Sequence, residues 1–114
     1  MRQTNETSCR TLTSDEVMAK LAAGEEIFIV DVREPRPFLA RHIPDAIHLP
    51  ADDFADRYTR ELDADDAVIL VCEHGRNSEA AVKFLLSQGF TNVASLQGGM
   101  NAWNGPTEGR APGA

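Results

Sequence analysis

The sequence predicts an α/β fold built on a small parallel sheet. Short apolar runs alternate with helical patterns along the chain, as in proteins whose strands are joined by helices. Residues 68–71 are four apolar residues in succession, which is typical of a strand buried on both faces. The chain has 114 residues, 42% of them apolar, so we expect one globular domain with its own core.

In the first half of the chain, we expect a flexible leader at 1–9 and a short edge strand at 10–12. Thr13 stands three residues before Glu16, the spacing of a helix-capping box, and apolar residues then recur at helical spacing up to Gly24. The β-branched run at 27–32 predicts a strand. The remaining elements expected here are a helical turn at 35–40 and a turn with a short strand at 42–50.

In the second half, residues 51–60 predict a surface helix with acidic residues between its apolar positions. A strand is expected at 68–71, a helix at 78–88 that stops at Gly89, and a last strand at 93–96. Gly98-Gly99 predicts a tight turn before a helical turn at 100–103. We place the domain at 10–104 and expect the Gly- and Pro-rich tail at 105–114 to be disordered.

Cys72 is the candidate nucleophile, because it lies at the end of a buried strand and in front of a helix. The free N–H groups and the positive dipole end of that helix favour an anionic thiolate over a neutral thiol. Gly75 permits an unusual backbone turn, and Arg76 adds a fixed positive charge. The residues after Cys72 therefore predict a nest of donors around one sulfur. The alternative is a small buried hydrophobic residue, the usual role of a lone cysteine.

Composition excludes several other classes of protein. The formal net charge of −7 and the lack of a basic cluster argue against nucleic-acid binding. The acidic clusters lack the spacing of a Ca²⁺ or Mg²⁺ loop, so we expect no metal site there. No apolar run is long enough to span a membrane, and the polar N-terminal stretch does not resemble a secretory signal. With only Cys9 and Cys72, a structural disulfide is not expected, and we expect a cytoplasmic protein.

Three motifs in order along the chain resemble the rhodanese homology domain. They are the segment 31–34 (Asp-Val-Arg-Glu), the segment 42–47 (His-Ile-Pro-Asp-Ala-Ile) and the loop 72–78 (Cys-Glu-His-Gly-Arg-Asn-Ser), with Gly98-Gly99-Met100 and Trp103 fitting the closing segment. The resemblance covers roughly residues 10–104. It implies a five-stranded, mostly parallel sheet flanked by helices on both faces.

The resemblance also implies a sulfurtransferase that works through a persulfide on Cys72. The thiolate would take the sulfane sulfur of a small anionic donor such as thiosulfate, and cyanide or a thiol would then remove it, with ping-pong kinetics. A sulfur-relay protein is a possible partner. The residues expected to hold the donor or the persulfide follow Cys72 directly: Glu73, His74, Gly75, Arg76, Asn77 and Ser78. Asp31, Arg33 and His42 are expected to support the site, mainly through structure.

The chain departs from the family pattern at several positions. An arginine is usual five positions after the cysteine, where this chain has Asn77 and carries its arginine one place earlier, at Arg76. Arg41 and Asp45 replace glycines that are usual around the His-Ile-Pro turn. Glu73 adds a negative charge beside the nucleophile, which either weakens attraction for thiosulfate or points to solvent.

Two alternatives to the enzyme come from related domains. Phosphatases and arsenate reductases of this fold need a loop one residue longer, with arginine six positions after the cysteine, and here that position is Ser78. A noncatalytic interaction module is common among rhodanese-like domains that have lost the cysteine, and this chain retains Cys72. Both alternatives therefore rank below the sulfurtransferase. Cys9 could serve as an internal sulfur acceptor only if the leader folds back.

Overall fold

The computed structural model describes residues 10–110, so the predicted leader with Cys9 and residues 111–114 lie outside the described range. Five strands form one sheet in the order β1-β5-β4-β2-β3, and every neighbouring pair is parallel. The strands are β1 (Thr11–Leu12), β2 (Phe28–Asp31), β3 (Ile47–His48), β4 (Val68–Val71) and β5 (Val93–Leu96). The predicted α/β fold with a parallel five-stranded sheet is confirmed.

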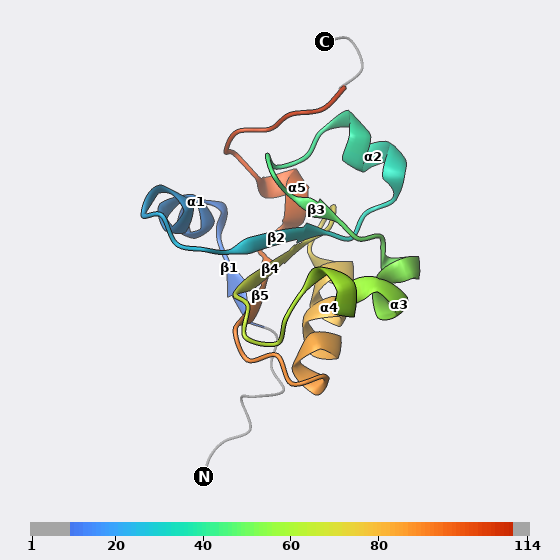
Figure 1. Ribbon diagram of the computed structural model, residues 1–114. Helices are drawn as coiled ribbons and strands as arrows, with labels where there is room; N and C mark the ends of the chain where they lie inside the picture. The colour runs from blue at the N-terminus through green and yellow to red at the C-terminus, as the bar shows by residue number, and fades with distance from the viewer. Residues whose placement is uncertain (1–9, 111–114) are drawn as a thin grey trace.

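Helices connect the strands and cover both faces of the sheet (Figure 1). They are α1 (Ser14–Ala22), α2 (Pro35–Ala40), α3 (Ala51–Glu61), α4 (Arg76–Ser87) and α5 (Gly99–Ala102). One core cluster joins α3 and α4 to the sheet, and a second joins α1 and α5 to its other face. Helices on both faces explain why β4 is apolar throughout instead of alternating with polar residues.

The side chains of β4 show how one strand serves both clusters. Val68 and Leu70 belong to the cluster under α3 and α4, whereas Ile69 and Val71 belong to the cluster under α1 and α5. Successive side chains of a strand point to opposite faces, so all four are buried. Cys72 continues this alternation and belongs to the α3 and α4 cluster.

Local sequence signals explain where α1 begins. Thr13 Oγ1 accepts a hydrogen bond from the Glu16 backbone N–H at 3.1 Å, and Glu16 Oε1 accepts one from the Thr13 backbone N–H at 2.8 Å. This is the predicted capping box, in which the two residues satisfy each other's free donors. The expected start of the helix is therefore confirmed.

The start of α4 differs from the prediction. We expected the helix at 78–88, but it begins at Arg76, so Arg76, Asn77 and Ser78 form its first turn instead of a loop. Gly75 caps the helix with φ +98°, a left-handed conformation that glycine adopts without strain. The apolar periodicity begins only at Ala80, so it could not locate this earlier start.

The segment at 105–110 contacts the domain although the sequence suggested a disordered tail. Glu108 and His42 exchange backbone hydrogen bonds of 2.8 and 2.9 Å, and the Arg110 N–H donates to the Leu39 carbonyl at 2.7 Å. Figure 1 shows this C-terminal segment running back towards α2.

Asp45, in the His-Ile-Pro turn, has φ +67°, the left-handed conformation suited to glycine, which aspartate tolerates better than most residues.

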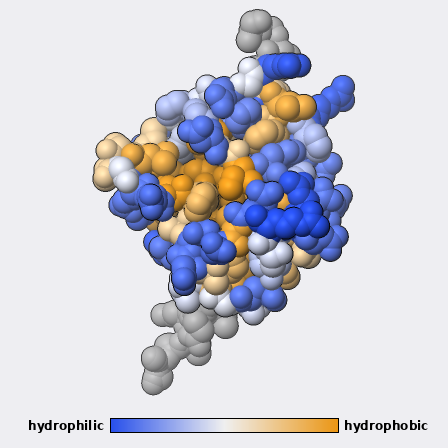
Figure 2. All heavy atoms as spheres, in the orientation of Figure 1, coloured by the Kyte–Doolittle hydropathy of each residue, from blue (hydrophilic) through white to orange (hydrophobic). Residues whose placement is uncertain are grey.

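The surface of the described residues combines charged and apolar regions. Figure 2 shows apolar residues gathered near the middle of one face with hydrophilic residues around them. The large apolar side chains that remain exposed are Leu21, Phe28 and Leu39. Within residues 10–110, no helix has the length and apolar character needed to cross a membrane.

Candidate active site

Cys72 lies where β4 ends, in a short loop that leads into α4. Its side chain is buried, with 2% of the residue exposed. The backbone N–H of Gly75 donates a hydrogen bond of 2.9 Å to Cys72 Sγ. The first N–H groups of α4 have no acceptor within the helix, so the sulfur faces a helix end that favours negative charge. The loop around Cys72 can therefore stabilise a thiolate or a persulfide anion.

Two buried serines form the inner wall of the sulfur site. Ser78 Oγ lies 3.3 Å from Cys72 Sγ and 2.6 Å from Ser95 Oγ, which comes from β5. Ser78 also donates to the carbonyl oxygen of Gly75 at 3.1 Å. Neither serine is more than 1% exposed. Ser78 was predicted from the sequence, but Ser95 was not, because only the pairing of β5 beside β4 brings it next to the first turn of α4.

The start of α5 supports the loop from the other side. The N–H groups of Met100 and Asn101 donate to the carbonyl oxygens of Cys72 and Glu73, at 2.8 and 3.0 Å. Gly99 makes this close approach possible, since a Cβ atom there would collide with the Cys72 carbonyl oxygen and the Glu73 backbone. The two carbonyl groups thereby have their acceptor capacity satisfied by α5. The sequence indicated Gly98-Gly99 as a turn but not its contact with the loop.

Asp31 and Arg33 form a buried ion pair at the end of β2. Arg33 donates to both carboxylate oxygens of Asp31, at 2.9 to 3.2 Å, and its Nη1 donates to Glu73 Oε1 at 3.2 Å. Burial alone would lower the pKa of Arg33, but Asp31 and Glu73 together raise it above its ordinary value. Arg33 therefore keeps its charge and connects β2 to the residue after the nucleophile.

The contact of Glu73 with Arg33 bears on the negative charge that Glu73 adds beside Cys72. The Glu73 carboxylate contacts Arg33 while its side chain remains 49% exposed. Part of the negative charge beside Cys72 is therefore balanced by a buried guanidinium group. The predicted supporting residues Asp31 and Arg33 meet the loop through this contact.

The outer rim of the loop consists of His74, Arg76 and Asn77, all of which are exposed. Within residues 10–110, none of these three side chains has a hydrogen-bond or ion-pair partner. Gly75, between them, is buried and supplies backbone instead of a side chain. The rim side chains are thus available to a molecule that approaches the loop.

His42 has a different environment from the other predicted residues. Its Nδ1 lies 2.8 Å from the Phe38 carbonyl oxygen, and its ring stacks on the Phe38 ring with centroids 4.1 Å apart. Its Nε2 lies 3.5 Å from a carboxylate oxygen of Glu108. The contacts of His42 within the described range are with α2 and the 105–110 segment, and none is with the Cys72 loop.

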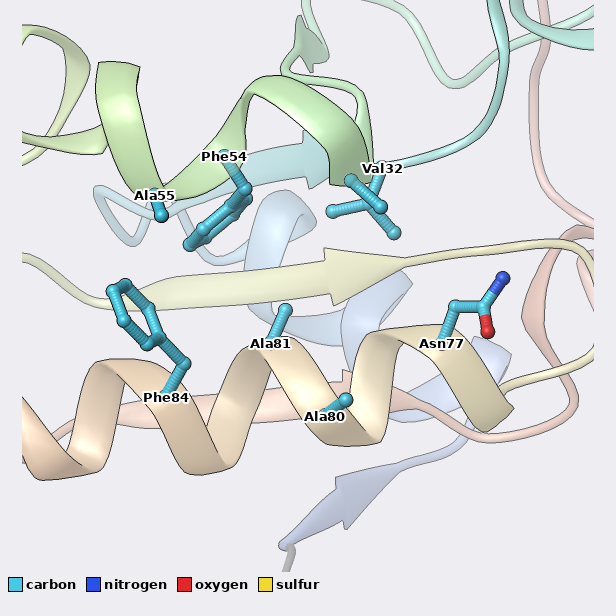
Figure 3. Close-up of a pocket in the computed structure, with 8 residues that line it drawn as sticks. Val32, Phe54, Ala55, Asn77, Ala80, Ala81 and Phe84 are labelled. Atoms are coloured by element: carbon cyan, nitrogen blue, oxygen red, sulfur yellow. The ribbon is translucent and has the colours of Figure 1, made fainter.

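An apolar groove of about 230 Å³ adjoins the loop between α3 and α4. Figure 3 shows Phe54 of α3 and Phe84 of α4 on its two sides and Asn77 at one end. The groove is lined by Val32, Ala51, Phe54, Ala55, Asn77, Ala80, Ala81 and Phe84. Asn77 is therefore shared between this groove and the rim of the Cys72 loop.

Comparisons with known proteins agree with this geometry. The profile of the Rhodanese-like domain family matches residues 13–106. Thiosulfate sulfurtransferase GlpE of Pseudomonas syringae is 44% identical over 75 residues, which are 66% of this chain and 70% of that protein.

Solved structures show the same likeness. The rhodanese-like domain of the Anabaena Alr3790 protein, in solution, has a TM-score of 0.81 and 30% identity, covering 91% of this chain and 85% of that one. A thiosulfate sulfurtransferase from Pseudomonas aeruginosa has a TM-score of 0.80 and 27% identity, covering 89% of this chain and 20% of that one. With the family profile matching most of the chain and the cysteine loop in its place after β4, this protein belongs to the family of rhodanese-like domains.

Proposed function

We propose that this protein is a sulfurtransferase that carries sulfur as a persulfide on Cys72 and accepts it from thiosulfate or a similar small anion. The observation that carries the proposal is the position of Cys72 Sγ, which receives the Gly75 N–H at 2.9 Å and faces the start of α4. A sulfur anion in this position is stabilised by backbone donors. The name of the Pseudomonas syringae relative, thiosulfate sulfurtransferase, supports the choice of donor.

The reaction has two halves. In the first, the Cys72 thiolate attacks the outer sulfur of thiosulfate, the bond to the sulfonate sulfur breaks, and its electron pair leaves with sulfite. In the second, cyanide or a thiolate attacks the outer sulfur of the persulfide, and the electron pair of the S–S bond returns to Cys72 Sγ. The protein holds the negative charge in both halves through backbone donors of the segment from Glu73 to Ser78, without a metal or cofactor.

We assign donor binding to the exposed rim. Arg76 offers a fixed positive charge with no partner within residues 10–110, and His74 and Asn77 add groups that form hydrogen bonds. Because 2% of Cys72 is exposed, a small donor that presents a terminal sulfur fits this site better than a bulky one. Asn77 in place of the usual arginine leaves Arg76 as the rim cation.

Asp31 and Arg33 act as structural supports of the loop, and His42 supports the turn at which it lies. The final acceptor that we propose for the persulfide is a thiol-bearing protein of a sulfur relay. A reactive thiol is best preserved in a reducing compartment, so we place the protein in the cytoplasm.

The test is turnover by the purified protein and its Cys72→Ser variant. With thiosulfate and cyanide we expect thiocyanate from the wild type, with parallel double-reciprocal lines when both substrates are varied. The variant should form none. Wild-type protein that forms no thiocyanate and takes no sulfur from thiosulfate, mercaptopyruvate or a cysteine desulfurase would refute the proposal.

A further inference from the structure

Ser95 is an unusual residue for its position in the sheet. It lies in the middle of β5 between Ala94 and Leu96, and it is 1% exposed. A buried hydroxyl group is unfavourable unless it forms a hydrogen bond. Within residues 10–110, the hydroxyl group of Ser95 forms a hydrogen bond with one side chain, that of Ser78, at 2.6 Å. Ser95 is therefore held against the residue that contacts the nucleophile.

Counting donors fixes the direction of this hydrogen bond. A serine hydroxyl has one hydrogen to donate and two lone pairs. Ser78 Oγ contacts the Gly75 carbonyl oxygen, Cys72 Sγ and Ser95 Oγ. When Cys72 is a neutral thiol, Ser78 gives its hydrogen to Gly75. When Cys72 is an anion, the sulfur and the Gly75 carbonyl compete for that hydrogen. In either case Ser95 has to be the donor in its contact with Ser78.

The charge on the sulfur therefore decides where the Ser78 hydrogen points. The Gly75 carbonyl can release it, because the carbonyl of a helix-capping residue also accepts the first hydrogen bond of the helix. A thiolate attracts the hydrogen more strongly than a neutral carbonyl, since hydrogen bonds to charged groups are about twice as strong. In a persulfide the negative charge lies mainly on the outer sulfur, so the inner sulfur no longer holds the hydrogen.

We propose that Ser95 is a positioning residue that directs the Ser78 hydroxyl towards Cys72 Sγ when this sulfur becomes negative, and thereby speeds the transfer of sulfur from the persulfide to the acceptor. This inference rests on the proposed persulfide mechanism. In the transfer step the acceptor forms a bond to the outer sulfur, the S–S bond breaks, and its electron pair moves onto Cys72 Sγ. Negative charge grows on that sulfur in the transition state, where the hydroxyl pair, that is, the hydroxyl groups of Ser78 and Ser95, can stabilise it.

Loading, the step in which Cys72 takes sulfur from the donor, has the opposite requirement. There the Cys72 thiolate loses negative charge as it attacks the donor, so a hydrogen bond to it stabilises the starting state more than the transition state. Once the thiol is ionised, loss of the hydroxyl pair should not slow loading. A purely structural role of Ser95 would instead slow both steps, because both use the same loop.

The experiment measures the two half-reactions separately for Ser95→Ala and the wild type. Both are followed at about pH 9.5, which lies above the ordinary thiol pKa of about 8.5. Loading is timed with thiosulfate by the gain of one sulfur in the intact mass, and unloading is timed after removal of the donor by mixing with cyanide. We expect unloading to slow about 2- to 5-fold and loading to change less than about 2-fold.

Four variants serve as comparisons. Ser95→Thr and Ser95→Val have nearly the same shape and share any packing penalty, but only threonine keeps the hydroxyl, so only threonine should unload faster than Ser95→Ala. Ser78→Ala removes the direct donor and should slow unloading by about 10-fold or more. Ser87→Ala changes an exposed serine on the same helix and should leave both rates unchanged.

Each outcome separates this inference from the proposed function. Wild-type protein that takes up no sulfur would remove both. Normal wild-type turnover with equal slowing of loading and unloading in Ser95→Ala would overturn the positioning role alone, and so would unloading at the wild-type rate. If neither Ser95→Thr nor Ser95→Val folds, Ser95→Ala decides the question by itself, since it removes a single oxygen atom.

Discussion

The inner and outer sides of the Cys72 loop differ in burial and in hydrogen bonding. The inner wall, formed by Ser78 and Ser95, is buried, and its hydroxyl groups contact the nucleophile or its loop directly. Gly99 supports the loop from the other side. The rim, formed by His74, Arg76 and Asn77, is exposed, and within the described residues its side chains have no partners.

This difference separates two tasks of the site. The inner wall is buried and uncharged, which suits it to holding a sulfur anion in either of its two chemical forms. The rim carries the positive charge of Arg76, which suits it to binding an anionic donor. We therefore expect inner substitutions to alter stability and transfer chemistry, and rim substitutions to alter donor affinity with little effect on stability. Four substitutions in and around the loop test how it is held and what it binds, beginning with the largest expected effect.

Arg33→Met should destabilise the fold most, by about 3 to 5 kcal/mol, because it leaves the buried Asp31 carboxylate without its ionic partner. The free energy of unfolding in urea measures this loss. Arg57→Met removes a partly exposed arginine that pairs along α3 and should cost less than about 0.5 kcal/mol. Equal effects of the two substitutions would mean that the Asp31 pair does not support the loop.

Gly99→Ala should destabilise the protein by about 2 to 4 kcal/mol and reduce turnover, since the new methyl group would push the Cys72 loop away from α5. Gly24→Ala is the matched control, because Gly24 also has a positive φ but a methyl group added there would meet no atom within 4 Å. It should lose about 1 kcal/mol from backbone strain alone. Similar unfolding energies and rates for both variants would argue against close packing at Gly99.

Arg76→Ala should raise the KM for thiosulfate about 3-fold and leave the unfolding free energy within about 0.5 kcal/mol of the wild type. Lys83→Ala is a control of the same charge on the same helix, about 10 Å further along it. It should have little effect on KM. If both variants have the wild-type KM, Arg76 does not contribute to donor binding.

Glu73→Gln should have the smallest effect. It removes a half-exposed carboxylate from Arg33, so stability should fall by less than about 1 kcal/mol. The loss of a negative charge beside Cys72 should increase the affinity for thiosulfate up to about 2-fold, an effect that should shrink as salt is added. A weaker affinity for thiosulfate in this variant would show that Glu73 helps to bind the donor.

The sequence predicted most of the fold because its signals are local. The apolar run Val68–Val71 and the Thr13 capping box each depend on residues close together in the chain, and both are found as expected. The start of α4 was placed two residues late because the left-handed conformation of Gly75 leaves no trace in apolar periodicity. Similarly, the contacts of residues 105–110 with α2 could not be read from their Gly- and Pro-rich composition.

The candidate site was only partly predictable for a related reason. Cys72 and the residues up to Ser78 form one continuous motif, so the sequence could identify them together. Ser95 and Gly99 reach the loop only because β5 lies beside β4 and α5 folds back against it. Such contacts join residues that are far apart in the chain, and no local pattern specifies them.

The most direct test of the account is the mass of the protein after it reacts with thiosulfate and is separated from the excess. Wild-type protein should gain one sulfur atom, located at Cys72, and should lose it to cyanide as thiocyanate, whereas Cys72→Ser should gain none. An added sulfur located at another residue, or equal uptake by the wild type and the variant, would contradict the assignment of Cys72 as the sulfur carrier.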